Sequence, residues 1–174
     1  MIGTRQRELD SILSKIVLVV EYEGTNYCGF QFQENAPTVQ NEIEKALTKL
    51  TGKSIRVVTA SRTDSGVHAW GQVLSFRIES ALKPKTYIKG LNYYLPPDIA
   101  VKASYKVNNR FNVQHDAVSR EYTYWIWNSG TRSALKRWST YQVSGKLDVE
   151  AIRAAPFAIC NKSSPIFKLA KNIS

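Results

Sequence analysis

The residues best suited to chemistry in this chain lie in one polar stretch, residues 61–73, with the sequence S-R-T-D-S-G-V-H-A-W-G-Q-V. Asp64 stands two positions after Arg62 and is followed by a Ser-Gly pair. A carboxylate on an accessible loop can act as a general base or as a nucleophile. The four residues T-D-S-G also suit an ordinary β-turn, because Asp and Ser hydrogen-bond to nearby backbone and Gly tolerates a positive φ. Those four residues alone leave both interpretations open.

Two strand-like segments flank this stretch and must position it. Residues 55–60, I-R-V-V-T-A, are rich in β-branched side chains, and Leu74, Phe76 and Ile78 alternate with polar residues. We therefore expect Asp64 to lie on a loop held between two strands. Loops on a rigid scaffold are a common location for catalytic residues.

The pattern along the first two thirds of the chain predicts the order β-α-β-β-α-β. Thr38 can cap a first helix that Gly52 ends, and Pro84 suits the first turn of a second helix that ends before Pro96. The expected strands span residues 15–22, 55–60, 72–78 and 99–107. This order is typical of an α+β fold of the ferredoxin-like, split βαβ type with an antiparallel sheet. Such a fold by itself indicates little about function.

Further along, residues 120–128 alternate aromatic and β-branched side chains and predict another strand. We divide the chain into a polar leader at 1–14, a catalytic ferredoxin-like domain at 15–110, the start of a second domain at 111–155, and an atypical or truncated tail at 156–174.

Composition favours a globular protein that binds a polyanion. The 174 residues carry 24 Lys and Arg against 14 Asp and Glu, a formal charge of +10, and a pI of about 9.7. A solvated basic surface would give the same charge. No apolar run approaches the roughly 18 residues of a membrane span, and the first residues do not form a secretory signal. Cys28 and Cys160 have no partners at metal-ligand spacing, which fits free thiols in a reducing cytoplasm.

Residues 61–73 resemble the signature G-R-T-D-A-G-V-H-A-x-G-Q-V of the tRNA pseudouridine synthase A family. Further segments resemble motifs of that family, in the family's order. They are Y-E-G-T-N-Y-C-G-F-Q-F-Q at 22–33, T-V-Q at 38–40 with the helix after it, L-N-Y-Y-L-P-P-D-I at 91–99, and R-E-Y-T-Y-W-I at 120–126. The resemblance covers roughly residues 15–128.

The resemblance implies an isomerase that converts uridine to pseudouridine in the tRNA anticodon arm. It implies no cofactor and no metal, tRNA as the partner, a homodimer in the complete family member, and a cytoplasmic location without membrane attachment. Asp64 matches the catalytic aspartate, as nucleophile or base. Arg62 would pair with it and contact phosphate or fill the space of a flipped nucleotide, or would form only a structural salt bridge. Tyr122 matches the tyrosine that stacks on the target base, although an ordinary strand aromatic would look the same.

Candidate RNA contacts complete the expected site. Their polar or basic side chains could reach RNA, but loop hydrogen bonding or solvation explains them equally well. These candidates are Gln31, Gln33, His68, Arg120 and Arg132. We interpret His68 as non-catalytic.

The chain also departs from the family pattern. Gln114 stands where the motif F-H-A-R-F-x-A has arginine, and His115 replaces its second aromatic residue. Neither the H-D-F segment nor the G-F-L-x-x-M-V-R stretch of the family's second half is found. Two alternatives to an active synthase follow: a truncated, inactive RNA-binding remnant, and a ferredoxin-like RNA-binding module.

Overall fold

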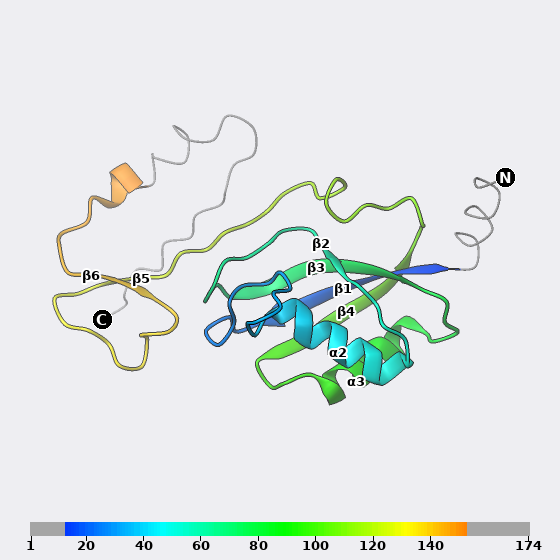
Figure 1. The fold of residues 1–174 in the computed structure, drawn as a ribbon. Coiled ribbons are helices and arrows are strands. Elements are labelled where there is room, and N and C mark those ends of the chain that lie inside the picture. The colour runs from blue at the N-terminus through cyan, green and yellow to red at the C-terminus, as the bar shows by residue number, and fades with distance from the viewer. Residues whose placement is uncertain (1–12, 153–174) are drawn as a thin grey trace. The chain divides into compact units, whose positions relative to one another are not determined.

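The computed structural model describes residues 13–152, which form parts of two compact units. The first unit extends to Ala117 and the second begins at Val118 (Figure 1). Most of the expected leader and all of the expected tail at 156–174 lie outside the described residues.

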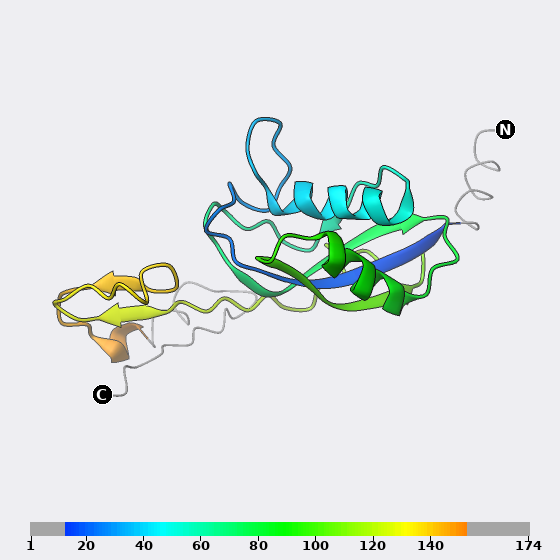
Figure 2. The same ribbon diagram turned by 90° about the horizontal axis from the view of Figure 1, so that it is seen from below.

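The first unit has the predicted α+β, ferredoxin-like architecture. Its elements are β1 (Ser14–Tyr22), α2 (Val39–Thr51), β2 (Val58–Thr59), β3 (Ala69–Ile78), α3 (Pro84–Tyr94) and β4 (Ile99–Val107). The sheet has the order β2-β3-β1-β4, and every neighbouring pair is antiparallel. Both helices cover the same face of the sheet (Figures 1 and 2). This arrangement confirms the element order predicted from the sequence.

Local sequence explains where the two helices begin and end. The Thr38 hydroxyl accepts a hydrogen bond from the Asn41 amide at 3.3 Å, and Gly52 takes a left-handed conformation with φ of 71° after the last turn of α2. Pro84 occupies the first turn of α3, where its missing N–H costs nothing. Both predicted caps of α2 are therefore confirmed.

The core lies between the helices and the covered face of the sheet. Alternate residues of β1, among them Leu18 and Val20, are fully buried there with Leu74 of β3. Phe76 and Tyr87 meet edge to face, with ring centroids 5.6 Å apart, and tie β3 to α3. Because such interiors relax little, truncating Leu18 to alanine would cost roughly 2–5 kcal/mol.

The second strand is shorter than the sequence predicts, two residues instead of 55–60. Side chains of α2 take up both backbone groups of Val57. Glu44 accepts from its amide at 3.0 Å, and Gln40 donates to its carbonyl at 3.4 Å. The chain therefore runs beside α2 before it joins the sheet. Conversely, β3 begins at Ala69, three residues earlier than predicted, because Ala69 pairs with Tyr22 beyond a register shift that places one extra residue on β3.

In the second unit, two short strands pair in parallel, β5 (Ile126–Asn128) and β6 (Tyr141–Val143). The strand predicted at 120–128 is correct only for its last three residues. Residues 120–125 lie outside the strand, and Tyr122, Tyr124 and Trp125 are between 42% and 58% exposed. Alternation alone signals a strand but does not supply the neighbour that makes one.

Candidate functional site

Asp64 lies on the loop between β2 and β3, exposed to solvent. Its carbonyl accepts a hydrogen bond from the amide of Val67 at 3.2 Å, and Gly66 within this turn has a φ of 77°. A β-turn therefore exists here, one residue later than the predicted T-D-S-G turn, with Asp64 as its first residue. The turn directs the chain and leaves the carboxylate accessible, so the two interpretations of this sequence are compatible.

The residue before Asp64 is held from two sides. The hydroxyls of Tyr22 and Thr63 lie 2.7 Å apart, and the amide of Phe30 donates to the Thr63 carbonyl at 3.0 Å. Tyr22 is the last residue of β1 and is only 3% exposed. Its burial raises the pKa of its phenol, against a smaller opposite effect of the Thr63 hydrogen bond. A rigid strand end therefore fixes the backbone on one side of Asp64.

The residues after Asp64 are held by Tyr27. Its carbonyl accepts from the Gly66 amide and from the Ser65 hydroxyl, each at 3.2 Å. The phenol of Tyr27 donates to Oδ1 of Asp98 at 2.7 Å. Burial and the neighbouring Asp98 carboxylate raise the pKa of this phenol well above its usual value, so that it remains a donor. Asp64 is therefore clamped on both sides by residues of the segment 22–30.

Two glycines allow this segment to approach the Asp64 loop so closely. A β-carbon on Gly24 would lie 2.1 Å from the carbonyl oxygen of Val67, and one on Gly29 would lie 2.8 Å from that of Thr63. Gly29 also has a φ of 92°, which other residues rarely adopt. The two segments with the strongest motifs in the sequence are therefore packed backbone against backbone.

Buried polar groups support the entry to the loop. The Gln72 amide donates to the hydroxyl of Thr59 and to the carbonyl of Ser61, and the Thr59 hydroxyl also donates to Ser61 at 2.8 Å. Sequence reasoning did not assign a role to Tyr22, Tyr27, Thr59, Gln72 or Asp98. Four of these five belong to the motifs that carry the resemblance, which is the signal that could have identified them.

The other predicted site residues of the first unit differ in their exposure and in their hydrogen bonds. Arg62 is exposed, and within residues 13–152 no ion pair joins it to Asp64, so the expected pair is not formed. The Nδ1 atom of His68 accepts from the Gly24 amide at 3.1 Å, which gives this histidine a structural contact. Gln31 and Gln33 are both exposed, and Gln33 donates to the carbonyl of Cys28 at 2.9 Å.

The remaining predicted residues, Tyr122, Arg120 and Arg132, belong to the second unit and are exposed. Tyr122 is 45% exposed. Nearby cations contact aromatic rings of the same unit: Lys136 lies 4.0 Å from the centre of the Trp127 ring, and Arg137 lies 4.9 Å from that of Trp138. These contacts give Lys136 and Arg137 a structural role within the unit.

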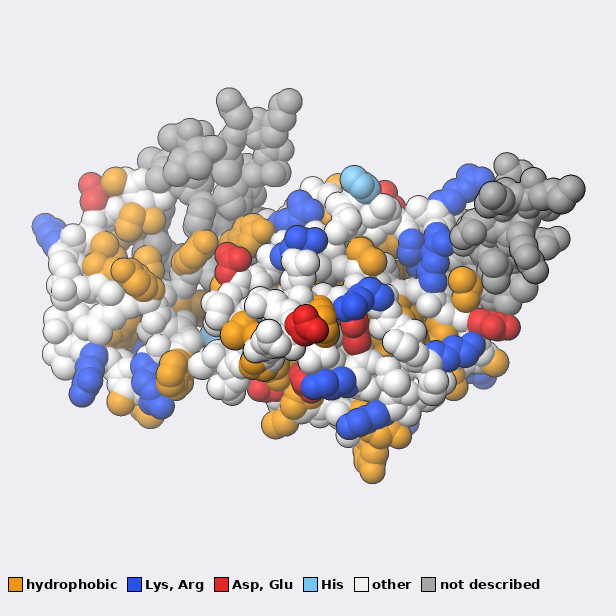
Figure 3. Space-filling model, viewed as in Figure 1, with side chains coloured by type: hydrophobic (Ala, Val, Ile, Leu, Met, Phe, Trp, Pro, Cys, Tyr) orange, Lys and Arg blue, Asp and Glu red, His pale blue; other side chains and the backbone are white. Residues whose placement is uncertain are grey.

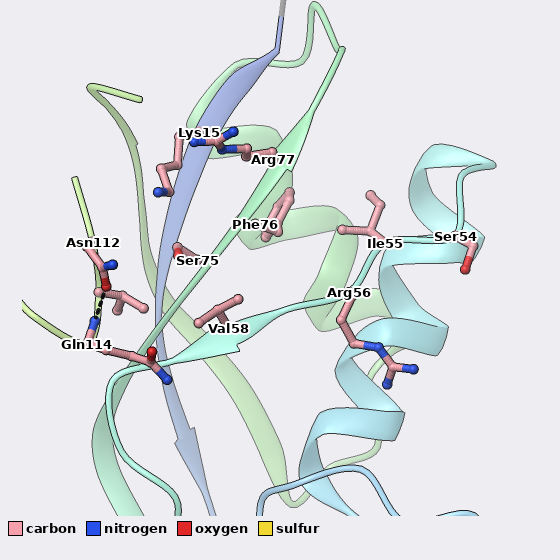
Figure 4. Close-up of a pocket in the computed structure, with 11 residues that line it drawn as sticks. Lys15, Ser54, Ile55, Arg56, Val58, Ser75, Phe76, Arg77, Asn112 and Gln114 are labelled. Carbon is pink, nitrogen blue, oxygen red and sulfur yellow. Dashed lines mark hydrogen bonds between the residues drawn. The ribbon is translucent and has the colours of Figure 1, made fainter. Parts of the chain in front are cut away.

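A hollow of about 380 Å³ lies on the first unit (Figure 4), and no residue of the Asp64 loop lines it. It is bordered by Lys15 and Arg77, which face each other across β1 and β3, and by residues 112–114. Roughly 20 Å of strand separates this end of β1 from Tyr22. Lys15 donates to the carbonyl of Phe111, and Arg77 donates to that of Asn109 at 3.3 Å. Burial and the nearby Arg77 lower the pKa of Lys15. Both cations thus hold the segment 109–111 in place.

Charge on the visible face of the first unit is mixed, with carboxylates among the basic side chains (Figure 3). Glu44 pairs with Arg56 at 3.1 Å and Glu42 with Lys45 at 2.8 Å. Across the described part of the chain, no group of three His, Cys, Asp or Glu residues is placed to hold a metal ion. None of the helices between residues 13 and 152 has the length and apolar character needed to cross a membrane.

Comparison with known proteins places these features in a context. A sequence model of the family described as "tRNA pseudouridine synthase" matches residues 18–116. The chain is 45% identical over 143 residues to the "tRNA pseudouridine synthase A" of Acetivibrio thermocellus, which covers 82% of this chain and 59% of the relative. It is 42% identical over 141 residues to the protein of the same name from Geotalea daltonii, covering 81% and 58%. With the protein of that name from Myxococcus xanthus it shares 42% identity over 143 residues, covering 82% and 54%. The chain thus spans less than two thirds of the length of these relatives.

Proposed function

The chain belongs to the tRNA pseudouridine synthase family, and from this we propose that it carries the catalytic aspartate of an enzyme that isomerises uridine to pseudouridine in the tRNA anticodon arm. Asp64 is the residue that we assign to this chemistry. The homodimer and the cytoplasmic location implied by the resemblance belong to the same proposal, and sedimentation of the completed protein tests the first of them.

The reaction exchanges one bond to the ribose for another. The bond from C1′ of the ribose to N1 of uracil breaks, the base turns, and a bond from C1′ to C5 forms. C5 then loses its proton and N1 gains one, so that atoms and electrons balance without an external oxidant or reductant. A carboxylate can assist as a nucleophile, toward the ribose or the base, or as a base that removes a proton.

The single observation that supports this role is the placement of Asp64. Its carboxylate is exposed, whereas Thr63 before it and Ser65 and Gly66 after it are hydrogen-bonded to buried residues. Catalytic groups work best when the backbone that carries them is fixed and their reacting atoms are accessible.

Two further residues have proposed roles in the same reaction. Arg62 is exposed and has no ion-pair partner among the described residues, so its guanidinium is available for an RNA phosphate or for the space of a flipped nucleotide. Tyr122 presents an exposed ring that can stack on the target base.

Tritium release from tRNA labelled at C5 of uridine tests the function directly, because C5 loses its hydrogen in the reaction. The assay compares the 174-residue chain with the same chain completed by the matching C-terminal part of the Acetivibrio thermocellus relative. We expect release by the completed protein, and release at background level after Asp64→Asn with tRNA affinity changed by no more than a few fold. Substantial release by Asp64→Asn contradicts the assignment. Tight tRNA binding by the completed protein without any release would favour an RNA-binding module instead.

A further inference from the structure

Tyr27 connects the turn that carries Asp64 to Asp98, a residue that follows the second helix of the domain, α3, in the chain. Its side chain is buried, with 6% exposed, and its phenol donates to Asp98 at 2.7 Å. Its carbonyl accepts both hydrogen bonds from the residues that follow Asp64. A displacement of Tyr27 would therefore move the backbone immediately after Asp64.

Asp98 is itself well anchored. It lies in the connection between α3 and β4, directly before the first residue of β4. Its carbonyl accepts a hydrogen bond from the amide of Glu23 at 2.9 Å, while its carboxylate accepts from Tyr27. One residue thus holds the segment 23–27 at both ends, and hydrogen bonds to a charged carboxylate are stronger than neutral ones.

We propose that Asp98 is a positioning residue, which acts through Tyr27 to hold the Asp64 turn in place. This inference rests on the proposed function for its catalytic consequence. The carboxylate of Asp98 accepts its hydrogen bond from Tyr27 and not from the turn, so Asp98 is not a catalytic residue.

Amide hydrogen exchange in the 174-residue chain, followed by NMR, tests the mechanical part without any need for activity. The probe is the Gly66 amide, which donates to the Tyr27 carbonyl, and the reference is the Leu18 amide in the central strand β1. Asp98→Ala should speed exchange at Gly66 about tenfold relative to Leu18, since hydrogen bonds to charged groups are among the stronger ones in proteins. Asp98→Asn keeps an acceptor oxygen and should change this ratio much less.

Asn92→Ala provides a matched control for a general loss of stability. Asn92 joins α3 to β4 by donating to the Val101 carbonyl at 3.0 Å and accepting from its amide at 2.7 Å, so its hydrogen bonds do not involve the segment 23–27. Its loss should affect both probe amides alike. An unchanged Gly66 to Leu18 ratio in Asp98→Ala would overturn the inference.

Steady-state kinetics of the completed protein test the catalytic part. Asp98→Ala should lower kcat at least tenfold with the KM for tRNA little changed, and Asp98→Asn should recover most of the rate. A wild-type kcat in Asp98→Ala would overturn the inference while leaving the proposed function intact. If even the wild-type completed protein does not turn over, the proposed function fails, and the exchange ratio alone decides whether Asp98 holds the turn.

Discussion

The α-carbon of Gly24 and the carbonyl of Val67 are in such close contact that a β-carbon on Gly24 would lie 2.1 Å from the oxygen and 2.6 Å from the carbonyl carbon. The amide of Gly24 also donates to His68, the next residue. Val67 is the last residue of the turn that begins at Asp64. The absence of a side chain at position 24 therefore determines how closely the segment 22–30 can approach that turn.

Gly24→Ala should therefore destabilise the domain by about 1–3 kcal/mol, the usual cost of overpacking, since the atoms in the way are backbone atoms that cannot rotate aside. Urea unfolding monitored by circular dichroism measures this cost. Gly71→Ala is the matched control, because its added β-carbon would meet only a methyl group of Val19 at an ordinary 3.8 Å. Equal stability of the two variants would show that the loop can shift without cost.

Stability should fall at alkaline pH through Tyr22 and Tyr27. Both phenols have pKa values raised above the usual 10.0, mainly by burial. Above pH 10 the unfolded chain loses these protons while the folded chain retains them, so the free energy of unfolding decreases with pH; below pH 10 neither group contributes a slope. Unfolding in urea between pH 8 and pH 11 should show a shallower decline for Tyr22→Phe and for Tyr27→Phe than for the wild type. Identical slopes would mean that the phenols ionise as easily in the folded chain.

Tyr122→Ala should impair turnover far more than binding in the completed protein, if its ring stacks on the target base. The expected cost is about 1–3 kcal/mol of the base-dependent interaction. Tyr122→Phe keeps the ring, so any additional loss in that variant would report a role for the hydroxyl. Single-turnover rates beside tRNA affinities measure both effects. Normal turnover by Tyr122→Ala would assign this residue a structural role.

Arg132→Ala should have the opposite effect, weaker binding to all RNAs with the rate on bound tRNA unchanged. A phosphate contact contributes through counterion release, and its loss should reduce the slope of log affinity against log salt by about one. A titration series in potassium chloride with tRNA and with an unrelated RNA of the same length measures this slope. An unchanged slope would show that Arg132 is simply solvated.

Sequence patterns were sufficient for the fold because its determinants are local. The cap at Thr38, the stop at Gly52 and the nearly continuous apolar run of β1 can each be read within a few residues. They were insufficient where a distant group decides. The side chains of Gln40 and Glu44 bond to the backbone of Val57 in place of a neighbouring strand and so shorten β2. The residues next to Val57 in the sequence give no sign of these contacts.

In the candidate site, too, local features were predictable and long-range contacts were not. The turn at Asp64 follows from its own residues, since Gly66 supplies the positive φ that the turn needs. The clamps around it join residues far apart in the chain, such as Tyr27 and Asp98, and only the folded sheet brings them together. The expected pair of Arg62 and Asp64 rested on the family resemblance, and two exposed side chains need not meet in the folded chain.

The clamps also have a consequence for the order of folding. Tyr22 and Thr63 are 41 residues apart in the chain, and Tyr27 and Asp98 are 71 apart. The pairing of β1 with β3 and β4 joins residues as far apart, and the clamps depend on it because it brings their loops together, so we expect the clamps to form late. Substitutions in the clamps should therefore accelerate unfolding and leave the folding rate nearly unchanged. The turn that carries Asp64 would then be the last part of the domain to acquire its geometry during folding and the first to lose it when the protein unfolds.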